Sequence, residues 1–394
     1  MKKFNYNKIV FIFVAVLIVS GLFSKPLVTG LAKAGLGFLR DKDVDKCIQN
    51  VNNSAEEIRY KGIIIDIQSL KDRLTGVRKV EKSDSTVVRL PNDYLSYYYE
   101  DLSEELVEKT ADSCENLKEF TESLDIPLMY VYVPVKSYFD ETMHTEYIKD
   151  CDKFIELLED RNVHTLNFEQ KMREKNLAME DAYFITDHHW KIETAFWAFS
   201  EICSELEKEY GFEYDKEATD LSNYSIKVYE DWFLGSEGKK VGRFFTPLGV
   251  DDFSLITPKF QTNLTVSDEG QPRTGEFENT ILKLKSLSKK SYHKSNSYAT
   301  YSHRDFPVQV IENNLAPENS PKVMVIKDSY ANAVSPFLSL VTKSIHNIDI
   351  REMHGDERVE SVFEYIKENR PDYVMVLYSG LNVSEDDFSK YDFK

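Results

Sequence analysis

The sequence of 394 residues lacks the patterns that indicate a nucleotide site. Neither G-x-G-x-x-G nor G-x-x-x-x-G-K-[ST] occurs, so a nucleotide cofactor has no support. The formal net charge is -18 and no basic face is evident, which argues against a nucleic-acid partner because phosphate binding needs positive charge. We therefore expect neither a cofactor nor a nucleic acid to bind this chain.

Cysteine is also scarce. The chain has 4 cysteines and no C-x-x-C pair, so neither a structural zinc site nor a redox pair is indicated. Cys114 and Cys203 each fall in an apolar stripe of helical spacing, which predicts that both are core residues.

The N-terminus combines basic residues with an apolar run. "MKKFNYNK" is basic, and the run over residues 9–23 is uncharged up to Lys25. This pattern is typical of a signal anchor or a cleaved signal peptide, and flanking lysines can extend a short span by snorkelling. We expect an uncleaved single-pass anchor with the remaining chain outside the cell, and a secreted protein is the alternative.

Beyond residue 60, short apolar runs alternate with amphipathic stretches. The runs predicted to be strands cover residues 62–67, 128–135, 163–168, 323–326, 345–350 and 373–378. The stretches predicted to be helices cover residues 101–124, 147–160, 191–209, 330–343 and 357–370. This alternation favours βαβ units and predicts an α/β fold, a three-layer α/β/α domain around a parallel sheet.

Residues 212–300 interrupt this alternation. They are more polar, with turn residues between short alternating runs, which predicts a β-rich insertion built of hairpins. We expect a signal anchor over residues 1–30, a helical linker over 31–60, and two parts of one α/β domain over 61–211 and 301–394.

The stretch "ITDHHW" places an acid, two histidines and a tryptophan side by side. In an extended segment residues i and i+2 face the same side, so Asp187 and His189 share a side and His188 points away. A carboxylate beside an imidazole fixes its tautomer and stabilises the imidazolium, so the pair predicts an orienting acid and a general base. Trp190 is predicted to be a packing residue that holds this loop.

A nucleophile for this pair is suggested by "KVMVIKDSYANAVSPFLSL". Residues 323–326 are predicted to be a buried strand and a helical pattern begins near Tyr330, so Ser329 lies at the strand-to-helix turn. Open α/β sheets place their sites at this edge, and a helix N-terminus offers N–H donors to an oxyanion. A simple N-cap would give the same local pattern.

A metal site is the other interpretation of "DHH". Asp187 and the two histidines fit such a site, but metals generally need three or four ligands. The other histidines, at positions 144, 164, 293, 303, 346 and 354, are scattered without ligand spacing. We therefore predict no metal.

Three stretches together carry a family resemblance. "TDHHW", "DWFLGSEGKKVGRFFTP" and "VMVIKDSYANAVSPFLS" resemble the bacterial DHHW protein family over most of the chain. That family is similar to the alginate O-acetyltransferase proteins, which have an SGNH-hydrolase-like fold and use an Asp-x-His motif followed by Trp, with a later Ser in a Gly-Asp-Ser-like turn. The resemblance implies that Asp187, His189 and Ser329 form the catalytic set.

The sequence departs from that pattern at the oxyanion site. The turn "KDS" lacks the usual Gly, and the Gly and Asn blocks of ordinary SGNH hydrolases are not recognisable. Beyond the backbone N–H of Ser329, Asn332 is a candidate oxyanion donor. Lys136 and Arg351, each after a predicted strand, are candidate substrate-binding residues at the same edge of the sheet. Capping or packing is the alternative role for Asn332, and a solvated position is the alternative for Lys136 and Arg351.

The predicted function is an extracytoplasmic O-acetyltransferase that modifies a cell-surface or secreted polysaccharide through an acyl-enzyme. The resemblance implies a multi-pass membrane acyltransferase as the partner that supplies acetyl groups. A carbohydrate acetylesterase is one alternative, because water and a sugar hydroxyl are both acceptors. A non-catalytic polysaccharide-binding or assembly protein on the same fold is the other.

Overall fold

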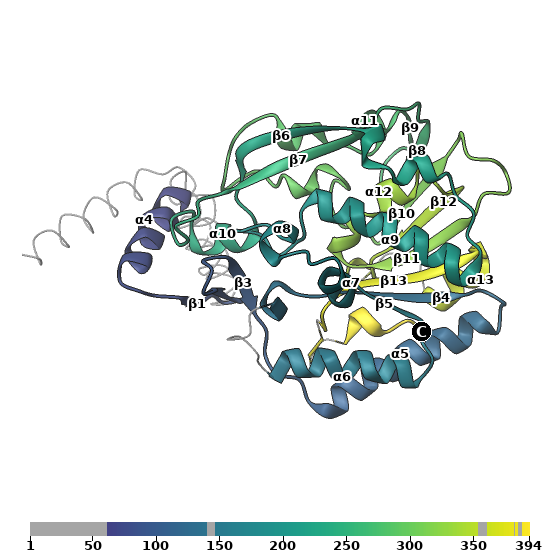
Figure 1. Ribbon diagram of the computed structural model, residues 1–394, viewed down its shortest axis with the longest axis horizontal. Helices are drawn as coiled ribbons and strands as arrows, with labels where there is room; N and C mark the ends of the chain where they lie inside the picture. The colour runs from purple at the N-terminus through teal and green to yellow at the C-terminus, as the bar shows by residue number, and fades with distance from the viewer. Residues whose placement is uncertain (1–60, 140–145, 354–360, 382, 385–387) are drawn as a thin grey trace, which may run out of the picture. The chain divides into compact units, whose positions relative to one another are not determined.

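The computed structural model describes residues 61–139, 146–353, 361–381, 383–384 and 388–394 (Figure 1). The chain divides into two compact units, residues 1–75 and 76–394. The predicted anchor, the predicted linker and Cys47 lie outside the described residues. Within the described part of the chain, no helix has the length and hydropathy of a membrane span.

The first unit contributes one described helix, α4 (Lys61–Leu74). The prediction of a strand over residues 62–67 is therefore wrong. Ile63, Ile67, Leu70 and Leu74 recur every three or four residues, a helical period that the short run "GIIIDI" does not display by itself.

An eight-stranded sheet forms the centre of the second unit, in the order β5-β4-β13-β11-β12-β10-β8-β9. The strands are β5 (Thr165–Asn167), β4 (Leu128–Val133), β13 (Tyr373–Ser379), β11 (Lys322–Lys327), β12 (Ser344–Ile348), β10 (Val308–Asn313), β8 (Leu264–Ser267) and β9 (Arg273–Gly275). The first five confirm the strands predicted beyond residue 100.

The sheet is mixed, so the prediction of a wholly parallel sheet is wrong at one edge. Strands β5, β4, β13, β11 and β12 are parallel, whereas β10, β8 and β9 pair antiparallel. Strands β8 and β9 come from the segment predicted to be an insertion. A tight hairpin joins only antiparallel strands, so this segment can extend the sheet without a crossover helix.

Helices cover both faces of the sheet (Figure 1). Strand β4 shows the two faces: Met129 and Val131 point into one core, and Tyr130 and Tyr132 point into the other. One face carries α5 (Glu104–Glu122), α6 (Glu146–Asp160) and α13 (Val362–Asn369). The opposite face carries α7 (Phe168–Glu174), α9 (Ile192–Tyr210) and α12 (Ser335–Leu338). The three-layer α/β/α arrangement is thereby confirmed.

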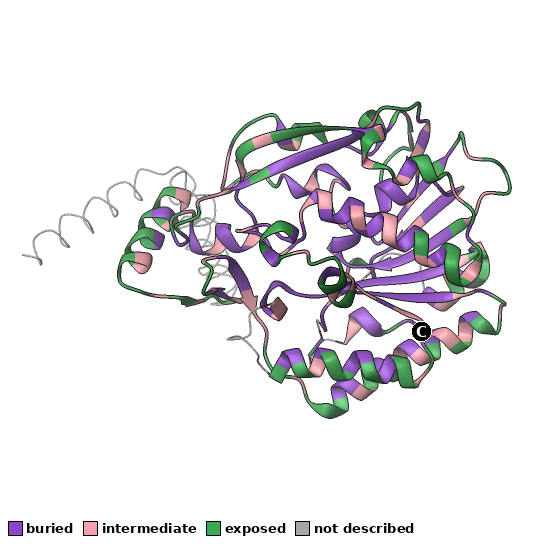
Figure 2. Ribbon diagram, viewed as in Figure 1, coloured by how far each residue is buried: buried purple, intermediate pink, exposed green. Residues whose placement is uncertain are grey.

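Burial follows these layers: the central strands β4, β11 and β13 are almost wholly buried, whereas the outer helix faces are exposed (Figure 2). Cys114 and Cys203 are buried free thiols, as their helical spacing predicted. The single helix predicted over residues 330–343 is instead two short pieces, η7 (Ser329–Ala333) and α12. Pro336 has no N–H to continue a helix from the preceding turn, which explains the break.

The second unit also contains smaller elements outside the central sheet and its covering helices. A three-stranded antiparallel sheet contains β1 (Lys79–Glu81), β2 (Thr86–Arg89) and β3 (Leu95–Tyr98). A hairpin pairs β6 (Tyr224–Phe233) with β7 (Asp251–Pro258). The remaining helices are α8 (Met179–Ala182), α10 (Ser236–Val241), α11 (Phe277–Thr280), η1 (Lys136–Phe139), η3 (Lys216–Thr219), η4 (Leu221–Asn223), η5 (Leu284–Leu287), η6 (Tyr298–Thr300), η8 (Ile350–Glu352) and η9 (Ser389–Tyr391).

Candidate active site

The stretch "ITDHHW", residues 185–190, forms a loop between α8 and α9 that we call the histidine loop. Tyr183 and Trp190 close it with an isolated antiparallel bridge. Within it, the Nδ1 atom of His189 lies 2.5 Å from Oδ1 of Asp187, and the backbone N–H of His189 donates to the same oxygen at 3.1 Å. Asp187 thus fixes both the backbone and the ring of its neighbour.

Ser329 contacts this pair although it lies far away in the sequence. It begins η7 directly after β11, in a turn of residues 327–330 that we call the serine turn. Its Oγ lies 2.7 Å from Nε2 of His189, across 140 residues of sequence. Its backbone N–H has no acceptor among the residues that the structure describes, so it is available to a developing oxyanion.

The charge of Asp187 is set by its surroundings. Its Oδ2 accepts a hydrogen bond of 2.6 Å from the backbone N–H of Ser236. Burial alone raises the pKa of Asp187, but His189, His188 and this N–H outweigh it and hold the pKa well below its usual value. The carboxylate is therefore ionised, and it stabilises an imidazolium at His189.

The stretch "FLGSEG" positions that N–H donor. A Cβ on Gly235 would lie 2.1 Å from Cβ and 2.5 Å from Cα of Asp187, so only glycine allows the two backbones to approach this closely. A Cβ on Gly238 would lie 2.9 Å from Cβ of Thr186. Sequence reasoning missed Ser236, although the spaced glycines of this stretch were a signal of close backbone contact.

Lys136 is buried next to the histidine loop. Its side chain is 1% exposed, and its ammonium donates to Glu237 at 2.6 Å and to the carbonyl of Phe184 at 3.2 Å. The other oxygen of Glu237 accepts from the backbone N–H of Tyr97 at 3.0 Å. The ammonium of Lys136 is thus engaged within the protein, and its predicted contact with substrate stays a prediction that would require this pair to open.

A second buried acid supports the start of the loop. Asp251 is 3% exposed and accepts from the backbone N–H of Thr186 at 2.9 Å, and also from its hydroxyl and from the N–H of Ile185. Burial, only partly offset by these bonds, raises the pKa of Asp251 to about 6. Asp251 lies 65 residues from Thr186, and no local pattern in the sequence pointed to it.

The serine turn is held by Asp328. Its Oδ1 caps η7 by accepting from the N–H of Tyr330 at 3.0 Å. Its Oδ2 accepts from the N–H and the hydroxyl of Ser379, each at 2.8 Å, and from the ammonium of Lys390 at 3.2 Å. Burial raises the pKa of Asp328, but Lys390, further charge and these bonds lower it well below its usual value. Lys390, near the end of the chain, was not identified from the sequence.

The position before Asp328 carries Lys327 in place of the glycine of the usual motif. Lys327 is the last residue of β11, and its ammonium contacts Asp305 at 2.9 Å, Asp349 at 3.3 Å and the amide oxygen of Asn332 at 2.8 Å. The amide N–H of Asn332 donates to Asp305 at 2.8 Å. Both ends of the Asn332 amide are engaged, so its predicted oxyanion role would require these bonds to break.

Arg351 belongs to the same cluster of charges. Its guanidinium donates to both oxygens of Asp349, at 2.8 and 2.6 Å, and its side chain is 30% exposed. The structure therefore places Arg351 in an internal ion pair with an accessible edge. Its predicted contact with substrate stays a prediction.

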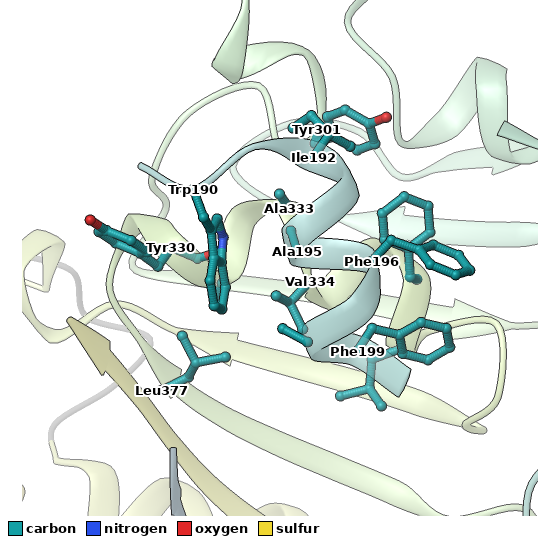
Figure 3. Close-up of a cluster of buried hydrophobic side chains, with 14 of the residues drawn as sticks. Trp190, Ile192, Ala195, Phe196, Phe199, Tyr301, Tyr330, Ala333, Val334 and Leu377 are labelled. Carbon is teal, nitrogen blue, oxygen red and sulfur yellow. The ribbon is translucent and has the colours of Figure 1, made fainter. Parts of the chain in front are cut away.

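Aromatic side chains fix the two halves of the site against each other (Figure 3). Trp190 is fully buried, and its indole N–H donates to the carbonyl of Tyr330 at 3.2 Å. The hydroxyl of Tyr330 in turn donates to the carbonyl of His188. The ring of Tyr298 stacks on His189 with 3.8 Å between centroids. The imidazole of His189 is therefore held by packing as well as by Asp187.

Asp187, His188 and His189 also offer one ligand atom each within 4.8 Å of one another, and no other such cluster occurs in the described ranges. The carboxylate of Asp187, both ring nitrogens of His189 and Nδ1 of His188 already have partners. Asp187 accepts from Ser236 and His189, and Nδ1 of His188 lies 2.8 Å from the Ser236 hydroxyl. A metal would have to displace these bonds, whereas nucleophilic chemistry uses them as they stand.

The fold and the site define an SGNH-hydrolase-like α/β domain. A family model described as "SGNH hydrolase-like domain, acetyltransferase AlgX" matches residues 95–225, a range that holds the histidine loop but not Ser329. The predicted resemblance to the DHHW family and to alginate acetyltransferase proteins is confirmed at this level. A comparison with curated proteins gives no match.

Solved structures share the fold. Bacillus cereus PatB1 with a sulfonyl adduct is 22% identical, with 79% of this chain and 100% of that chain covered and a TM-score of 0.64. A DHHW family protein from Eubacterium siraeum DSM 15702 is 18% identical, with coverages of 77% and 92% and a TM-score of 0.54. At these identities the likeness establishes the fold alone.

Proposed function

We propose that this chain is an O-acetyltransferase that acts on a polysaccharide outside the cytoplasm, with Ser329 as its nucleophile. The observation that carries the proposal is one continuous line of contacts: Ser329 Oγ lies 2.7 Å from His189 Nε2, and His189 Nδ1 lies 2.5 Å from Asp187. These are the distances that a nucleophile, a general base and an orienting acid require. The match to an acetyltransferase domain model supports acetyl as the transferred group.

In the first half-reaction, Oγ of Ser329 attacks the carbonyl carbon of an acetyl ester and its proton passes to Nε2 of His189. Ionised Asp187 stabilises the imidazolium, and the backbone N–H of Ser329 donates to the oxyanion. The bond to the leaving group then breaks, and the leaving oxygen takes the proton from His189. An acetyl ester remains on Ser329.

In the second half-reaction, a sugar hydroxyl gives its proton to His189 and attacks the acetyl carbon. The bond between that carbon and Oγ breaks, and Ser329 recovers the proton from His189. The acetyl group has then moved to the sugar with no net change in protonation of the protein. Water in place of the sugar would complete a hydrolysis by the same steps.

The proposed location rests on the N-terminal segment, and the proposed partner rests on the family resemblance. Its basic residues precede an apolar run, which supports an anchor with the α/β domain outside the membrane. A multi-pass membrane acyltransferase would then supply acetyl groups from the cytoplasm. Protease treatment of intact cells is expected to digest the α/β domain, and full protection that is lost only on lysis would contradict this topology.

Labelling tests the nucleophile directly. A sulfonyl fluoride is expected to add mass to the peptide that holds Ser329, and the protein is expected to hydrolyse p-nitrophenyl acetate. Ser329→Ala abolishes both, whereas Ser113→Ala, a half-buried serine on α5, changes neither. A folded Ser329→Ala protein that is labelled or active like the parent would refute the mechanism. Activity that chelators abolish and that ignores Ser329 would favour the metal site.

A further inference from the structure

His188 is the member of the histidine loop that the mechanism above leaves without a role. Its side chain is 25% exposed, whereas that of His189 is 8% exposed. The two rings lie 3.8 Å apart between centroids, so His188 forms part of the site surface directly beside the general base.

Two hydrogen bonds hold His188, one at its ring and one at its backbone. Its Nδ1 lies 2.8 Å from the hydroxyl of Ser236, and its backbone carbonyl accepts from the hydroxyl of Tyr330. Its Nε2 has no partner among the described residues and is not fully buried. The ring is thus held in place with one nitrogen left open.

The imidazole ring that carries this open nitrogen is neutral. Burial and the neighbouring His189 lower the pKa of His188 to about 3, so its imidazole carries no charge at ordinary pH. A neutral imidazole has one donor and one acceptor nitrogen, and the bond with Ser236 decides which role is left to Nε2. His188 therefore offers a hydrogen bond without competing with His189 for the proton of the reaction.

The surroundings of His188 suit a polyhydroxylated ligand. The ring of Tyr97, a partly buried residue, lies 5.5 Å from that of His188. The ammonium of Lys240 lies 5.4 Å from the Tyr97 centroid and is held by Asp84 and Ser85, each at 2.7 Å. Ring faces combined with a few fixed polar groups are the usual lining of a pocket that orients a small ligand.

We propose that Nε2 of His188 hydrogen bonds to a hydroxyl of the acceptor sugar adjacent to the hydroxyl that reacts, and so selects a polyol over a simple alcohol. The inference rests on the proposed function, because it assigns the acceptor side of the same site. No bond to His188 forms or breaks: the acetyl group moves from Ser329 to the acceptor, and the proton moves through His189.

The experiment measures acceptor choice in the full-length chain. With p-nitrophenyl acetate as donor, 1,2-propanediol and 1-propanol compete as acceptors, and the ratio of the two acetate products is recorded. His188→Phe keeps a ring and loses both nitrogens, so the preference for the diol is expected to fall about tenfold, the value of one hydrogen bond. His188→Gln keeps a hydrogen-bonding end and retains more of the preference than His188→Phe.

Two further variants sharpen the result. Ser236→Ala removes the hydroxyl that holds His188 but keeps the backbone N–H that Asp187 uses, so its ratio is expected to fall between those of the parent and His188→Phe. His346 is the matched control, because its Nδ1 also lies beside a hydroxyl, that of Tyr365, at 2.9 Å. His346→Phe is expected to leave the ratio at the parent value.

The remaining outcomes contradict either this inference or the proposed function. Parent-like ratios in folded His188→Phe, or equal ratios in the Phe and Gln variants, overturn the inference and leave the Ser329 mechanism standing. A parent that hydrolyses the donor but acetylates neither alcohol overturns transfer, and the inference with it. A parent without turnover overturns the proposed chemistry. Loss of all turnover in His188→Phe, together with chelator sensitivity of the parent, overturns both in favour of a metal site.

Discussion

Two buried carboxylates support the two halves of the site, and their pKa values move in opposite directions. Burial, only partly offset by Lys136, raises the pKa of Glu237 behind the histidine loop to about 8. Burial also raises the pKa of Asp328 in the serine turn, but Lys390 and the neighbouring charges and donors lower it well below its usual value. Two carboxylates that are both buried therefore have pKa shifts of opposite direction.

The difference lies in how many donors each carboxylate receives. Glu237 accepts from one ammonium and one backbone N–H, those of Lys136 and Tyr97. Asp328 accepts from an ammonium, a hydroxyl and two backbone N–H groups, those of Lys390, Ser379 and Tyr330. The cost of desolvating a carboxylate is offset only when enough donors replace its water. Glu237 thus has one cation and one N–H to replace its water, whereas Asp328 has a network of four donors.

The largest expected effect comes from removing the reacting side chain of either half of the site. Ser329→Ala or His189→Ala should each lower kcat/KM for an acetyl ester by about 1,000-fold or more, because each removes a member of a unit that acts together. The double variant should be little worse than either single variant. Rates from stopped and continuous assays of p-nitrophenyl acetate hydrolysis check this. Additive losses in the double variant would mean that the halves act independently.

The sequence indicated the side chains that we propose to react more clearly than the residues that hold them. Asp187 and His189 share one short motif, and Ser329 follows a recognisable buried strand, so local patterns together with the family resemblance indicated all three. Glu237 lies 101 residues from Lys136 and 140 from Tyr97, and pairing over such distances leaves no local pattern. The position of Lys136 after a strand therefore gave no indication that its ammonium contacts Glu237.

For the fold, too, local patterns in the sequence predicted some elements and could not predict those that depend on long-range packing. Strands β4, β11 and β13 are nearly continuous apolar runs, and their burial on both faces made them recognisable. The antiparallel edge was missed because β8 and β9 are short strands that alternate in burial, and their partners are set by tertiary packing. Residues 330–343 have helical spacing, yet Pro336 interrupts the helix that this spacing predicts.

The second expected effect concerns the close approach that the histidine loop requires. Gly235→Ala places a Cβ 2.1 Å from the Asp187 side chain, so one of the two backbones must shift. We expect activity to fall about 100-fold while the protein stays folded, since a displacement of about 1 Å in a catalytic group has that consequence. Circular dichroism and ester hydrolysis measured on the same sample check both parts.

Gly270→Ala is the control for Gly235→Ala. Its added Cβ would lie 3.7 Å from the nearest atom, Oδ1 of Asp268, which is an ordinary contact. Activity is expected to match the parent. Full activity of Gly235→Ala would show that the histidine loop adapts to displacement and does not depend on this fit.

The third effect is on stability and tests the sign of the pKa shift at Glu237. Because the folded pKa of about 8 lies above the ordinary value of 4.5, the folded chain keeps a proton there that the unfolded chain releases. Stability from this group is therefore lost as the pH rises between these values. Glu237→Gln removes the dependence, so the Tm of the parent minus that of the variant should fall by about 2 °C or more from about pH 6 to about pH 9.

A Tm difference that instead grows with pH would contradict this prediction. It would mean that the ion pair with Lys136 outweighs the burial of Glu237, and that both halves of the site are held by ionised carboxylates. Lys136→Met is the companion variant, since it removes the cation and should deepen the loss of stability at high pH if Glu237 remains.

The smallest expected effect has the opposite sign and belongs to Asp305, which pairs with Lys327 of the serine turn. Burial raises the pKa of Asp305, but Lys327 and its other partners lower it to about 2, below the ordinary value of 3.8. The unfolded chain takes up a proton first as the pH falls, so stability from Asp305 is present above about pH 4 and is lost toward pH 2. The Tm of the parent minus that of Asp305→Asn should therefore shrink by about 1 °C between about pH 5 and about pH 3. Asp160→Asn, an exposed position at the end of α6, is the control and should show no such trend. A difference that is constant with pH would mean that the charge cluster around Lys327 does not hold Asp305 ionised, and the contrast between the two halves of the site would then rest on Asp328 alone.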